Sequence, residues 1–461
     1  MAEGVLGRIA AAKRQELESR FEGVSLDALR ARAVPTRRSL SAALAQEGAR
    51  FILEIKKASP SAGEIRPDAD PAEVARGYSG VADALSVLCD RAYFGGSLGD
   101  LAAARRGFDG PILAKDFFLD VRQVAEARIA GADAILVMLA LLDDSVARQM
   151  IAEARGFGMD ALVEVRDEAE MRRALGLGAP LIGINNRDLR DLSVDLGTTE
   201  RLAKLAPDRV LISESGIANR ADVDRIAPLV DAFLIGSALM RSADPAQAAR
   251  KLVFGRTKLC GLKCGADIRA ARPAAFAGFV FVLGSPRHVT ADVAAPLAGI
   301  ARRSGIRPVG VFRNAPMRTL ADVATLLNLH AVQLHGHEDA DYVRALRREL
   351  PPTCQIWTAC SVGRVPMVSR GGDRLLFDNA DGGSGRTFDW ALVECHPELP
   401  RAILAGGIGP HNAATAQQMG AHAIDIGSSV DLRPACKSPE KIFDLFEALR
   451  PRARKQLRAC A

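Results

Sequence analysis

Several apolar runs in the first half of the sequence end in charged or amide side chains. Glu54 and Lys56 close the first run, and their i, i+2 spacing in a strand sends both side chains to the same face. Later runs end in Lys115, Glu164, Asn185, Arg187 and Glu214. A neighbouring cation lowers the pKa of a lysine, whereas burial or a neighbouring carboxylate raises that of a glutamate. Such a cluster is expected to supply an acid and a base near neutral pH.

A plainer interpretation is that charges at strand ends only solvate the rim of the fold. This interpretation explains any one of these residues taken alone. Six of them at consecutive strand ends, above an anion site, favour a functional cluster instead.

In each half of the chain, the seventh and eighth of eight short apolar runs are followed by glycines twenty residues apart, with a serine after the second glycine. The residues are Gly216, Gly236 and Ser237 in the first half and Gly407, Gly427 and Ser428 in the second. Glycines let backbone N–H groups approach an anion at a helix N-terminus. No Walker lysine follows any glycine loop. The pattern therefore predicts phosphate monoester substrates.

Sixteen short apolar runs, alternating with helical patterns, position these residues. The first eight are 51–55, 84–88, 111–114, 134–138, 161–165, 181–184, 210–213 and 231–235. The second eight are 257–260, 278–282, 308–312, 331–334, 355–358, 374–377, 401–405 and 423–426. Alternation of this kind is typical of βαβ units and a parallel sheet. Eight strand–helix units close a barrel, so we expect an α/β protein made of two tandem (β/α)8 TIM barrels.

An open, doubly wound sheet is the structural alternative. It usually has fewer strands, and it needs a Gly-rich dinucleotide turn after its first strand, which neither half has. The predicted boundary falls near Gly255, which gives domains of residues 1–254 and 255–461. Residues 5–30 predict an N-terminal helical extension that either plugs the first barrel or covers its substrate.

Five motifs of the first half belong together. They are Glu54-Ile-Lys-Lys-Ala-Ser-Pro-Ser61, Leu113-Ala-Lys-Asp-Phe117, Leu162-Val-Glu-Val165, Gly183-Ile-Asn-Asn-Arg-Asp-Leu189 and Ser213-Glu-Ser-Gly-Ile217. They closely resemble those of indole-3-glycerol-phosphate synthase, and the resemblance runs over residues 5–254.

The resemblance implies roles for the residues of the first barrel. Lys115 would be the general acid that activates the ketone of the substrate for attack by the anthranilate ring. Lys56 would hold the substrate and support the same charge or a later proton transfer, and Glu164 would act in the dehydration. Glu54 and Asn185 would orient groups around Glu164. Glu214 and Ser215 would line the pocket, and Arg187 would be a further substrate-binding residue. Ser59, Gly216, Gly236 and Ser237 would hold the phosphate.

In the second half, Cys260 ends the first run and Asp378 ends the sixth. No histidine stands beside the cysteine in sequence, so the two residues suggest a proton-transfer pair more than a hydrolytic dyad. An isolated buried cysteine usually serves only as an apolar core residue.

Neighbouring motifs favour the functional interpretation. They are Lys258-Leu-Cys-Gly-Leu262, Ser285-Pro-Arg287, Val309-Gly-Val-Phe312, Val332-Gln-Leu-His-Gly336, Phe377-Asp-Asn379 and Gly382-Gly-Ser-Gly-Arg-Thr-Phe-Asp-Trp390. They resemble phosphoribosylanthranilate isomerase over residues 256–450.

That resemblance implies an Amadori rearrangement. Asp378 would protonate the ribose ring oxygen, and Cys260, as a thiolate, would remove the C2 proton of the sugar. Arg287 would hold the anthranilate carboxylate through a two-pronged contact. The phosphate would lie on Gly407, Gly427 and Ser428.

One segment departs from the isomerase pattern. The family usually shows a glutamate and a Pro-Gly turn after strand eight, whereas this chain has Asp431 and Pro434-Ala435. Alanine adopts positive φ less readily than glycine, so the conformation of this loop is open.

Two histidine or cysteine pairs are tempting as metal ligands. Cys260 with Cys264, and His335 with His337, lack a second pair at zinc-site spacing. We therefore expect no metal, and because no cofactor motif occurs, no cofactor.

Composition and charge narrow the range of expected partners and cellular locations. The net charge of +6 is small for 461 residues, and no basic stripe with interleaved aromatics accompanies the basic tail 450–458, so we expect no nucleic-acid partner. The longest apolar stretch, 134–142, is far shorter than the roughly 20 residues of a membrane helix. The N-terminus lacks the pattern of a signal peptide. Eight irregularly placed cysteines favour reduced thiols, so we expect a soluble cytoplasmic monomer that acts on small phosphate substrates.

Taken together, the two resemblances describe consecutive steps of tryptophan biosynthesis, in which the product of the second barrel is the substrate of the first. Two alternatives stay open. One barrel could be a phosphate-binding regulatory module that has lost catalysis, although Lys115, Glu164, Cys260 and Asp378 are all intact. The chain could also be a related phosphosugar isomerase or aldolase; an aldolase would form a lysine Schiff base that borohydride traps.

Overall fold

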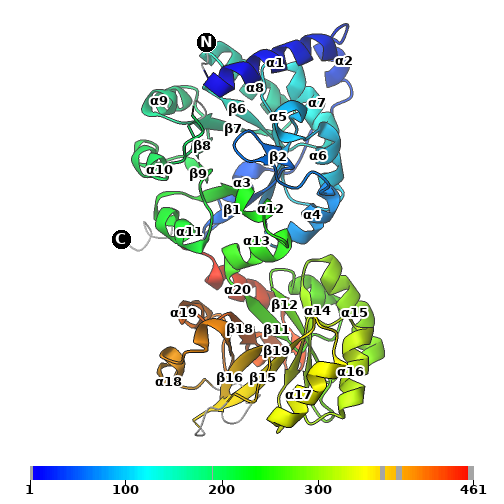
Figure 1. The fold of residues 1–461 in the computed structure, drawn as a ribbon. Helices are drawn as coiled ribbons and strands as arrows, with labels where there is room; N and C mark the ends of the chain where they lie inside the picture. Colours follow the sequence, from blue (N-terminus) through cyan, green and yellow to red (C-terminus); the bar gives the residue numbers. More distant parts are fainter. Residues whose placement is uncertain (1–3, 189–190, 364–368, 380–386, 455–461) are drawn as a thin grey trace. The chain divides into compact units, whose positions relative to one another are not determined.

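The computed structural model describes residues 4–188, 191–363, 369–379 and 387–454. The described chain divides into two compact units. Residues 4–249 and 451–454 form the first unit, and residues 250–450 form the second. In each unit a closed barrel of parallel strands is surrounded by helices (Figure 1).

Eight strands close the first barrel, with β1 paired to β10 so that Phe51 lies opposite Phe233. The strands are β1 (Arg50–Ile55), β4 (Ala84–Leu88), β5 (Ile112–Lys115), β6 (Ala134–Met138), β7 (Asp160–Val165), β8 (Leu181–Asn185), β9 (Val210–Glu214) and β10 (Ala232–Ile235). The principal helices after the strands are α4 (Pro71–Tyr78), α6 (Leu98–Arg105), α7 (Arg122–Ala130), α8 (Asp144–Gly156), α9 (Glu168–Gly176), α10 (Gly197–Leu202), α11 (Arg220–Ile226), the short α12 (Ser237–Met240) and α13 (Pro245–Phe254).

Local chemistry sets where these elements begin. The strands are apolar and buried along almost their whole length, as expected for a parallel sheet with helices on its outer face and packed side chains inside. Helix α4 begins with Pro71 at its first position, after Asp70, whose side chain accepts from Ala72 N at 2.9 Å. Helix α11 begins with a capping box formed by Asn219 and Asp222.

The second barrel repeats this topology, and β11 pairs with β18 to close it. Its strands are β11 (Thr257–Cys260), β12 (Phe276–Val280), β13 (Arg307–Phe312), β14 (Ala331–Leu334), β15 (Gln355–Val362), β16 (Arg374–Asn379), β17 (Ile403–Leu404) and β18 (Ala423–Ile426). Its helices are α14 (Gly265–Ala270), α15 (Ala291–Arg303), α16 (Met317–Leu326), α17 (Ala340–Glu349), α18 (Ala391–Glu394), α19 (Ala413–Gln418) and α20 (Pro439–Leu449).

The predicted fold of two tandem (β/α)8 barrels is confirmed, and each of the sixteen predicted runs overlaps a strand of its barrel. Strand β15 ends at Val362, four residues beyond the predicted 358, and β12 runs from Phe276 to Val280 and not from 278 to 282. Residues 274–280 are all buried, so no alternation in the sequence marks where this strand begins. Two short antiparallel two-stranded sheets were not predicted: β2 (Ala58–Ser59) with β3 (Gly63–Glu64), and β19 (Asp431–Arg433) with β20 (Cys436–Lys437).

The N-terminal extension forms two helices, α1 (Gly4–Arg20) and α2 (Leu26–Arg30), where the sequence predicted one. Gly23 separates them in a left-handed conformation, with φ of 70°. Leu6 and Ile9 of α1 join the apolar core of the first barrel and also line its cavity. The extension therefore both plugs the barrel and covers the site.

Helix α13 spans the change from one unit to the other. Arg250, on its last turns, is fully buried in the second unit, where it donates to the carbonyl oxygens of Ala274 at 2.9 Å and Ser304 at 2.6 Å. Phe254 packs edge-on against Phe446, with ring centroids 5.1 Å apart. Among the described helices, none is long and apolar enough to cross a membrane.

Candidate functional site

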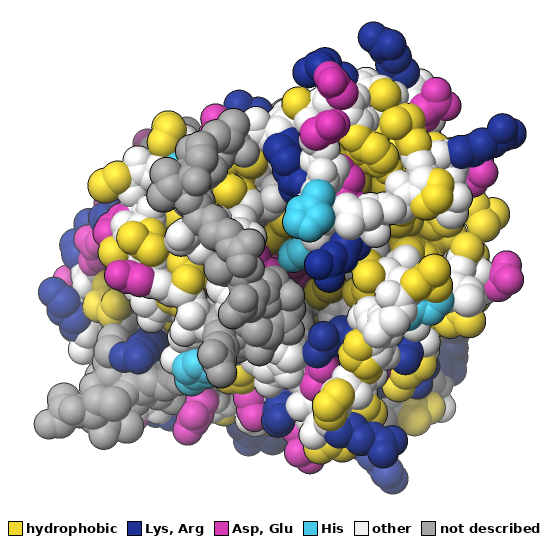
Figure 2. Space-filling view, turned by 90° about the horizontal axis from the view of Figure 1, so that it is seen from below, with side chains coloured by type: hydrophobic (Ala, Val, Ile, Leu, Met, Phe, Trp, Pro, Cys, Tyr) yellow, Lys and Arg dark blue, Asp and Glu magenta, His cyan; other side chains and the backbone are white. Residues whose placement is uncertain are grey.

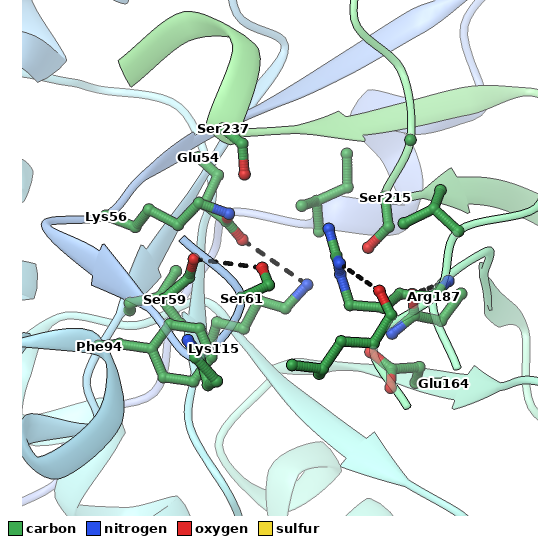
Figure 3. A pocket seen from close by; sticks show the side chains of 18 of the residues that line it. Glu54, Lys56, Ser59, Ser61, Phe94, Lys115, Glu164, Arg187, Ser215 and Ser237 are labelled. Carbon is green, nitrogen blue, oxygen red and sulfur yellow. Dashed lines mark hydrogen bonds and ion pairs between the residues drawn. The ribbon is translucent and has the colours of Figure 1, made fainter. Parts of the chain in front are cut away.

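A cavity of about 420 Å³ opens at the carboxyl ends of the first barrel's strands (Figure 3). Residues predicted for the site from separate strands and loops meet there. The predicted residues that line it are Glu54, Lys56, Ser59, Lys115, Glu164, Asn185, Arg187, Ser215, Gly216, Gly236 and Ser237. Glu214 completes the set from the end of β9, where it contacts Lys115.

Two lysines of the cavity share one buried carboxylate. Lys56 Nζ lies 2.7 Å from Glu54 Oε1, and Lys115 Nζ lies 3.6 Å from Glu54 Oε2 (Figure 3). Burial alone would raise the pKa of Glu54, but the two ammonium groups outweigh it and lower that pKa. Glu54 is therefore the fixed negative charge that holds both lysines in place.

Lys115 is held most closely by Glu214, whose Oε2 lies 2.7 Å from its Nζ. Burial lowers the pKa of Lys115, but Glu214, Glu54 and Glu164 outweigh burial and raise it. The sequence-based expectation that a neighbouring cation would lower a lysine pKa is thus wrong for Lys115, because three carboxylates surround it. Lys115 stays an ammonium group and can donate a proton.

Glu164 is a residue of this site whose charge changes near neutral pH. Burial, and then the charge of Glu214, raise its pKa to about 8. Lys115 and a hydrogen bond from Asn185 act in the opposite direction without cancelling this rise. Glu164 is therefore mostly protonated at neutral pH and can act there as an acid.

Glycines on the neighbouring strands leave room for the side chains of this cluster. A Cβ at Gly183 would collide with the carboxylate of Glu214, and one at Gly236 would collide with that of Glu54. Ser215 takes a positive φ of 64°, which is unfavourable for a residue other than glycine and is typical of functional loops.

Sequence reasoning missed several residues of this mouth. Ser61, Phe94, Asp90, Asp116 and Arg241 also line the cavity. Ser61 and Asp116 stand inside two of the synthase-like motifs, so their positions were usable signals, whereas Phe94, Asp90 and Arg241 lie outside those motifs.

Lys13 of α1 reaches two of these carboxylates. Its Nζ lies 2.8 Å from Asp90 Oδ1 and 3.0 Å from Asp116 Oδ1. Only 2% of the Lys13 side chain is exposed, so this ion pair fastens α1 over the mouth. Burial raises the pKa of Asp116 to about 6 in spite of the lysine.

The second barrel has its own cavity of about 430 Å³ at the same end of its strands. The residues predicted for it all line this cavity: Cys260, Arg287, Asp378, Gly407, Gly427 and Ser428. Arg313 and His335 line it as well, and Figure 2 shows histidine and basic side chains gathered near the middle of the face in view.

Asp378 and Cys260 have different surroundings in this cavity. Asp378 Oδ2 lies 3.3 Å from His335 Nε2, and His335 Nδ1 lies 3.1 Å from Gln333 Nε2. Burial raises the pKa of the Cys260 thiol, and Lys258 is the main group that opposes this rise. Sequence reasoning did not consider Lys258, although a lysine inside an apolar strand is an unusual signal.

The loop that departed from the isomerase pattern takes a conformation typical of glycine. Ala435 has a positive φ of 63°, and its N–H donates to Asp431 Oδ2 at 3.2 Å. Asp431 also accepts from Arg287 Nη2 at 2.8 Å, so it orients the predicted carboxylate-binding arginine.

Three sequence features fall partly outside the described residues. They are Leu189 of one synthase motif, residues 382–386 of one isomerase motif and residues 455–458 of the basic tail. In the part of the chain that is described, no three histidine, cysteine, aspartate or glutamate side chains are grouped to hold a metal ion.

Comparisons with known proteins match each half of the chain to one family. The family model for indole-3-glycerol phosphate synthase matches residues 6–252, and that for N-(5'phosphoribosyl)anthranilate isomerase matches residues 257–448.

Whole-chain relatives carry both parts. A protein of Yersinia pestis named tryptophan biosynthesis protein TrpCF is 44% identical over 87% of this chain and 84% of its own. Its namesake in Salmonella typhi is 42% identical over 97% and 99%. A crystal structure of phosphoribosyl anthranilate isomerase from Thermus thermophilus is 30% identical, covers 42% of this chain and 98% of its own, and has a TM-score of 0.37. The chain therefore belongs to the family of bifunctional tryptophan biosynthesis enzymes that join an indole-3-glycerol-phosphate synthase to a phosphoribosylanthranilate isomerase.

Proposed function

We propose that Lys115 is the general acid of the synthase and protonates the ketone oxygen as the anthranilate ring attacks. The observation that carries this proposal is the position of its ammonium group, buried between Glu214 at 2.7 Å and Glu54 at 3.6 Å and facing the cavity. Glu164, with its pKa raised to about 8, supplies the proton for the later loss of water.

The other residues of the first mouth bind and orient the substrate. Lys56 holds the substrate and supports charge development or a later proton transfer, while Glu54 and Asn185 orient the groups around Glu164. The phosphate binds to Ser59, Gly216, Gly236 and Ser237, which all line the cavity. Arg187 and Ser215, which lie across the cavity from Ser59 and Ser237 in Figure 3, complete the binding site.

In the second mouth, Asp378 is the acid that opens the ribose ring, and Cys260 is the base that removes the C2 proton. Both line one cavity, as the transfer of two protons on one sugar requires. Arg287 binds the anthranilate carboxylate, and its position is supported by the 2.8 Å contact with Asp431. Gly407, Gly427 and Ser428 bind the phosphate.

The chain acts as a monomer on small phosphate substrates, without a nucleic-acid, membrane or cofactor partner. Residues of a single barrel line each cavity, which supports separate work by the two barrels. The domains 1–254 and 255–461 each carry one activity.

Two single variants test the division of labour. Lys115→Ala is expected to abolish formation of indole glycerol phosphate from phosphoribosylanthranilate, and the ketone intermediate should accumulate. Loss of a positioned general acid costs about 10²- to 10⁴-fold in rate. Cys260→Ala is expected to leave phosphoribosylanthranilate unconsumed, yet it should convert ketone that is supplied from outside. In each variant, the activity of the unaltered barrel is the control for correct folding. An ordinary rate of indole glycerol phosphate formation by Lys115→Ala would remove that residue from the mechanism.

A further inference from the structure

A buried ion pair lies inside the second barrel and has no role in the mechanism so far. Lys258 of β11 and Asp425 of β18 stand opposite each other in the register of these strands. Lys258 Nζ lies 2.7 Å from Asp425 Oδ2, and the lysine side chain is 0% exposed. A lysine this deeply buried is rare unless it is paired, and pairing alone seldom adds stability over apolar residues.

Cys260 lies directly beside this pair. It follows Lys258 by two residues on the same strand, so both side chains point to the same face. On the neighbouring strand β12, Gly278 has no side chain to separate them. A Cβ at Gly278 would lie 3.1 Å from Lys258 Cε and 3.2 Å from Cys260 Sγ. The glycine therefore leaves the lysine stem and the sulfur next to each other.

The charges around Cys260 are few. Lys258 on its own strand and Lys437 on β20 favour the thiolate, whereas Asp425 on β18 opposes it. The residue of β12 beside Cys260 is Gly278, which carries no charge. Burial raises the pKa of the Cys260 thiol, and Lys258 is the strongest of the groups that lower it. Asp425 also helps to raise the pKa of Lys258, so the lysine remains charged.

We propose that Lys258 is a positioning residue of the isomerase: its ammonium group, oriented by Asp425, is the counter-charge that favours the thiolate form of Cys260. The proposal rests on the role of Cys260 as base. In that step the C2–H bond breaks and the proton moves to the sulfur. The electron pair forms the C1–C2 double bond as the Schiff-base nitrogen takes the electrons of the C=N bond. Lys258 keeps its protons throughout.

Alkylation of the intact protein tests this proposal directly. Iodoacetamide reacts with the thiolate, so its rate with Cys260 reports the thiolate fraction. In Lys258→Met we expect this rate at about pH 8 to fall by about tenfold or more, which corresponds to a pKa rise of about one unit. Cys264, which is exposed in the same barrel, serves as the internal control and should react at its wild-type rate. Peptide mass spectrometry separates the two sites.

Activity gives a second readout that a purely structural role would not produce. The isomerase kcat of Lys258→Met should be low at neutral pH and recover as the pH rises, while KM changes little. If the single variant does not fold, Lys258→Met with Asp425→Leu replaces both charges, so that neither is left buried and alone. The same fall in Cys260 alkylation is expected there. An unchanged Cys260 rate in the folded variant overturns the proposal. Normal isomerase activity of Cys260→Ala would instead overturn the role of the base and leave the alkylation result standing.

Discussion

At the scale of single residues, each barrel contains a lysine paired with a carboxylate from another strand. Lys115 faces the cavity and can donate its own proton, whereas Lys258 lies behind Cys260 and can act only through it. Glu214 has two effects in the first mouth: it fixes Lys115 at 2.7 Å, and its charge raises the pKa of Glu164. One carboxylate thus keeps two neighbouring acids protonated.

Glu214→Gln is therefore expected to move the alkaline limb of the synthase pH profile to lower pH, by roughly one unit. Glu164 acts in its protonated form, and the loss of the Glu214 charge lowers its pKa from about 8. The pKa of Lys115 falls in the same variant, so both changes have the same sign. The measurement is kcat for conversion of supplied ketone from about pH 6 to 9.5. The isomerase profile of the same protein should not move. An alkaline limb that stays in place would show that Glu214 does not set the proton affinity of this site.

Most of these residues could be predicted because the fold is periodic. Strand ends meet at one mouth, so Lys115, Glu164 and Asp378 could be placed there from their positions in the runs. Residues that act from outside this pattern could not be placed. Lys13 reaches the mouth from a helix about a hundred residues earlier in the chain than Asp116, and no local spacing encodes that contact. The sign of the pKa shift of Lys115 depended on how many carboxylates surround it, which only three-dimensional distances reveal.

At the scale of elements, α1 is the part of the first barrel that joins stability to the site. Leu6 and Ile9 belong to the apolar core and also line the cavity. Lys13 fixes the helix to Asp90 at the end of β4 and Asp116 at the end of β5. A buried lysine that neutralises two buried carboxylates is costly to remove, because the carboxylates then remain without their cation.

Lys13→Met should accordingly weaken the first barrel, by about 3–5 kcal/mol in free energy of unfolding. The pKa of Asp116, already raised to about 6 by burial, should rise further without Lys13. A carboxyl group whose pKa is higher in the folded than in the unfolded state destabilises the fold increasingly as the pH rises. The loss of stability in Lys13→Met relative to wild type should thus be larger at about pH 8 than at about pH 5. Heat inactivation of the synthase, with the isomerase of the same chain as reference, measures it.

Arg14→Met is the matched control, since Arg14 is exposed on the same helix. It should inactivate at the wild-type temperature. Equal heat inactivation of the two variants would mean that α1 is held by its apolar residues alone.

At the scale of the whole molecule, the chain passes between its two units at two places. The last turns of α13 belong to the second unit, through Arg250 and Phe254. After α20, residues 451–454 belong to the first unit, where Pro451 O accepts from Ala49 N at 2.9 Å and Arg454 Nη2 lies 2.7 Å from Asp231 Oδ2. A cut between residues 254 and 255 therefore removes structural residues from both units, although it leaves every proposed catalytic residue in its own half.

The fragment 255–461 should consequently keep isomerase activity but melt at a lower temperature than the fragment 245–461. It lacks Arg250, whose guanidinium donates to the carbonyls of Ala274 and Ser304, and Phe254, whose ring packs on Phe446. Loss of a buried phenylalanine alone costs about 3–5 kcal/mol. Phe254→Ala within 245–461 is the matched control, and it should reproduce part of the loss but not all of it. Thermal unfolding followed by circular dichroism, together with the isomerase assay, compares the three proteins. If 255–461 and 245–461 melt together, the end of α13 is only a connection between two barrels, and the second unit is complete from residue 255.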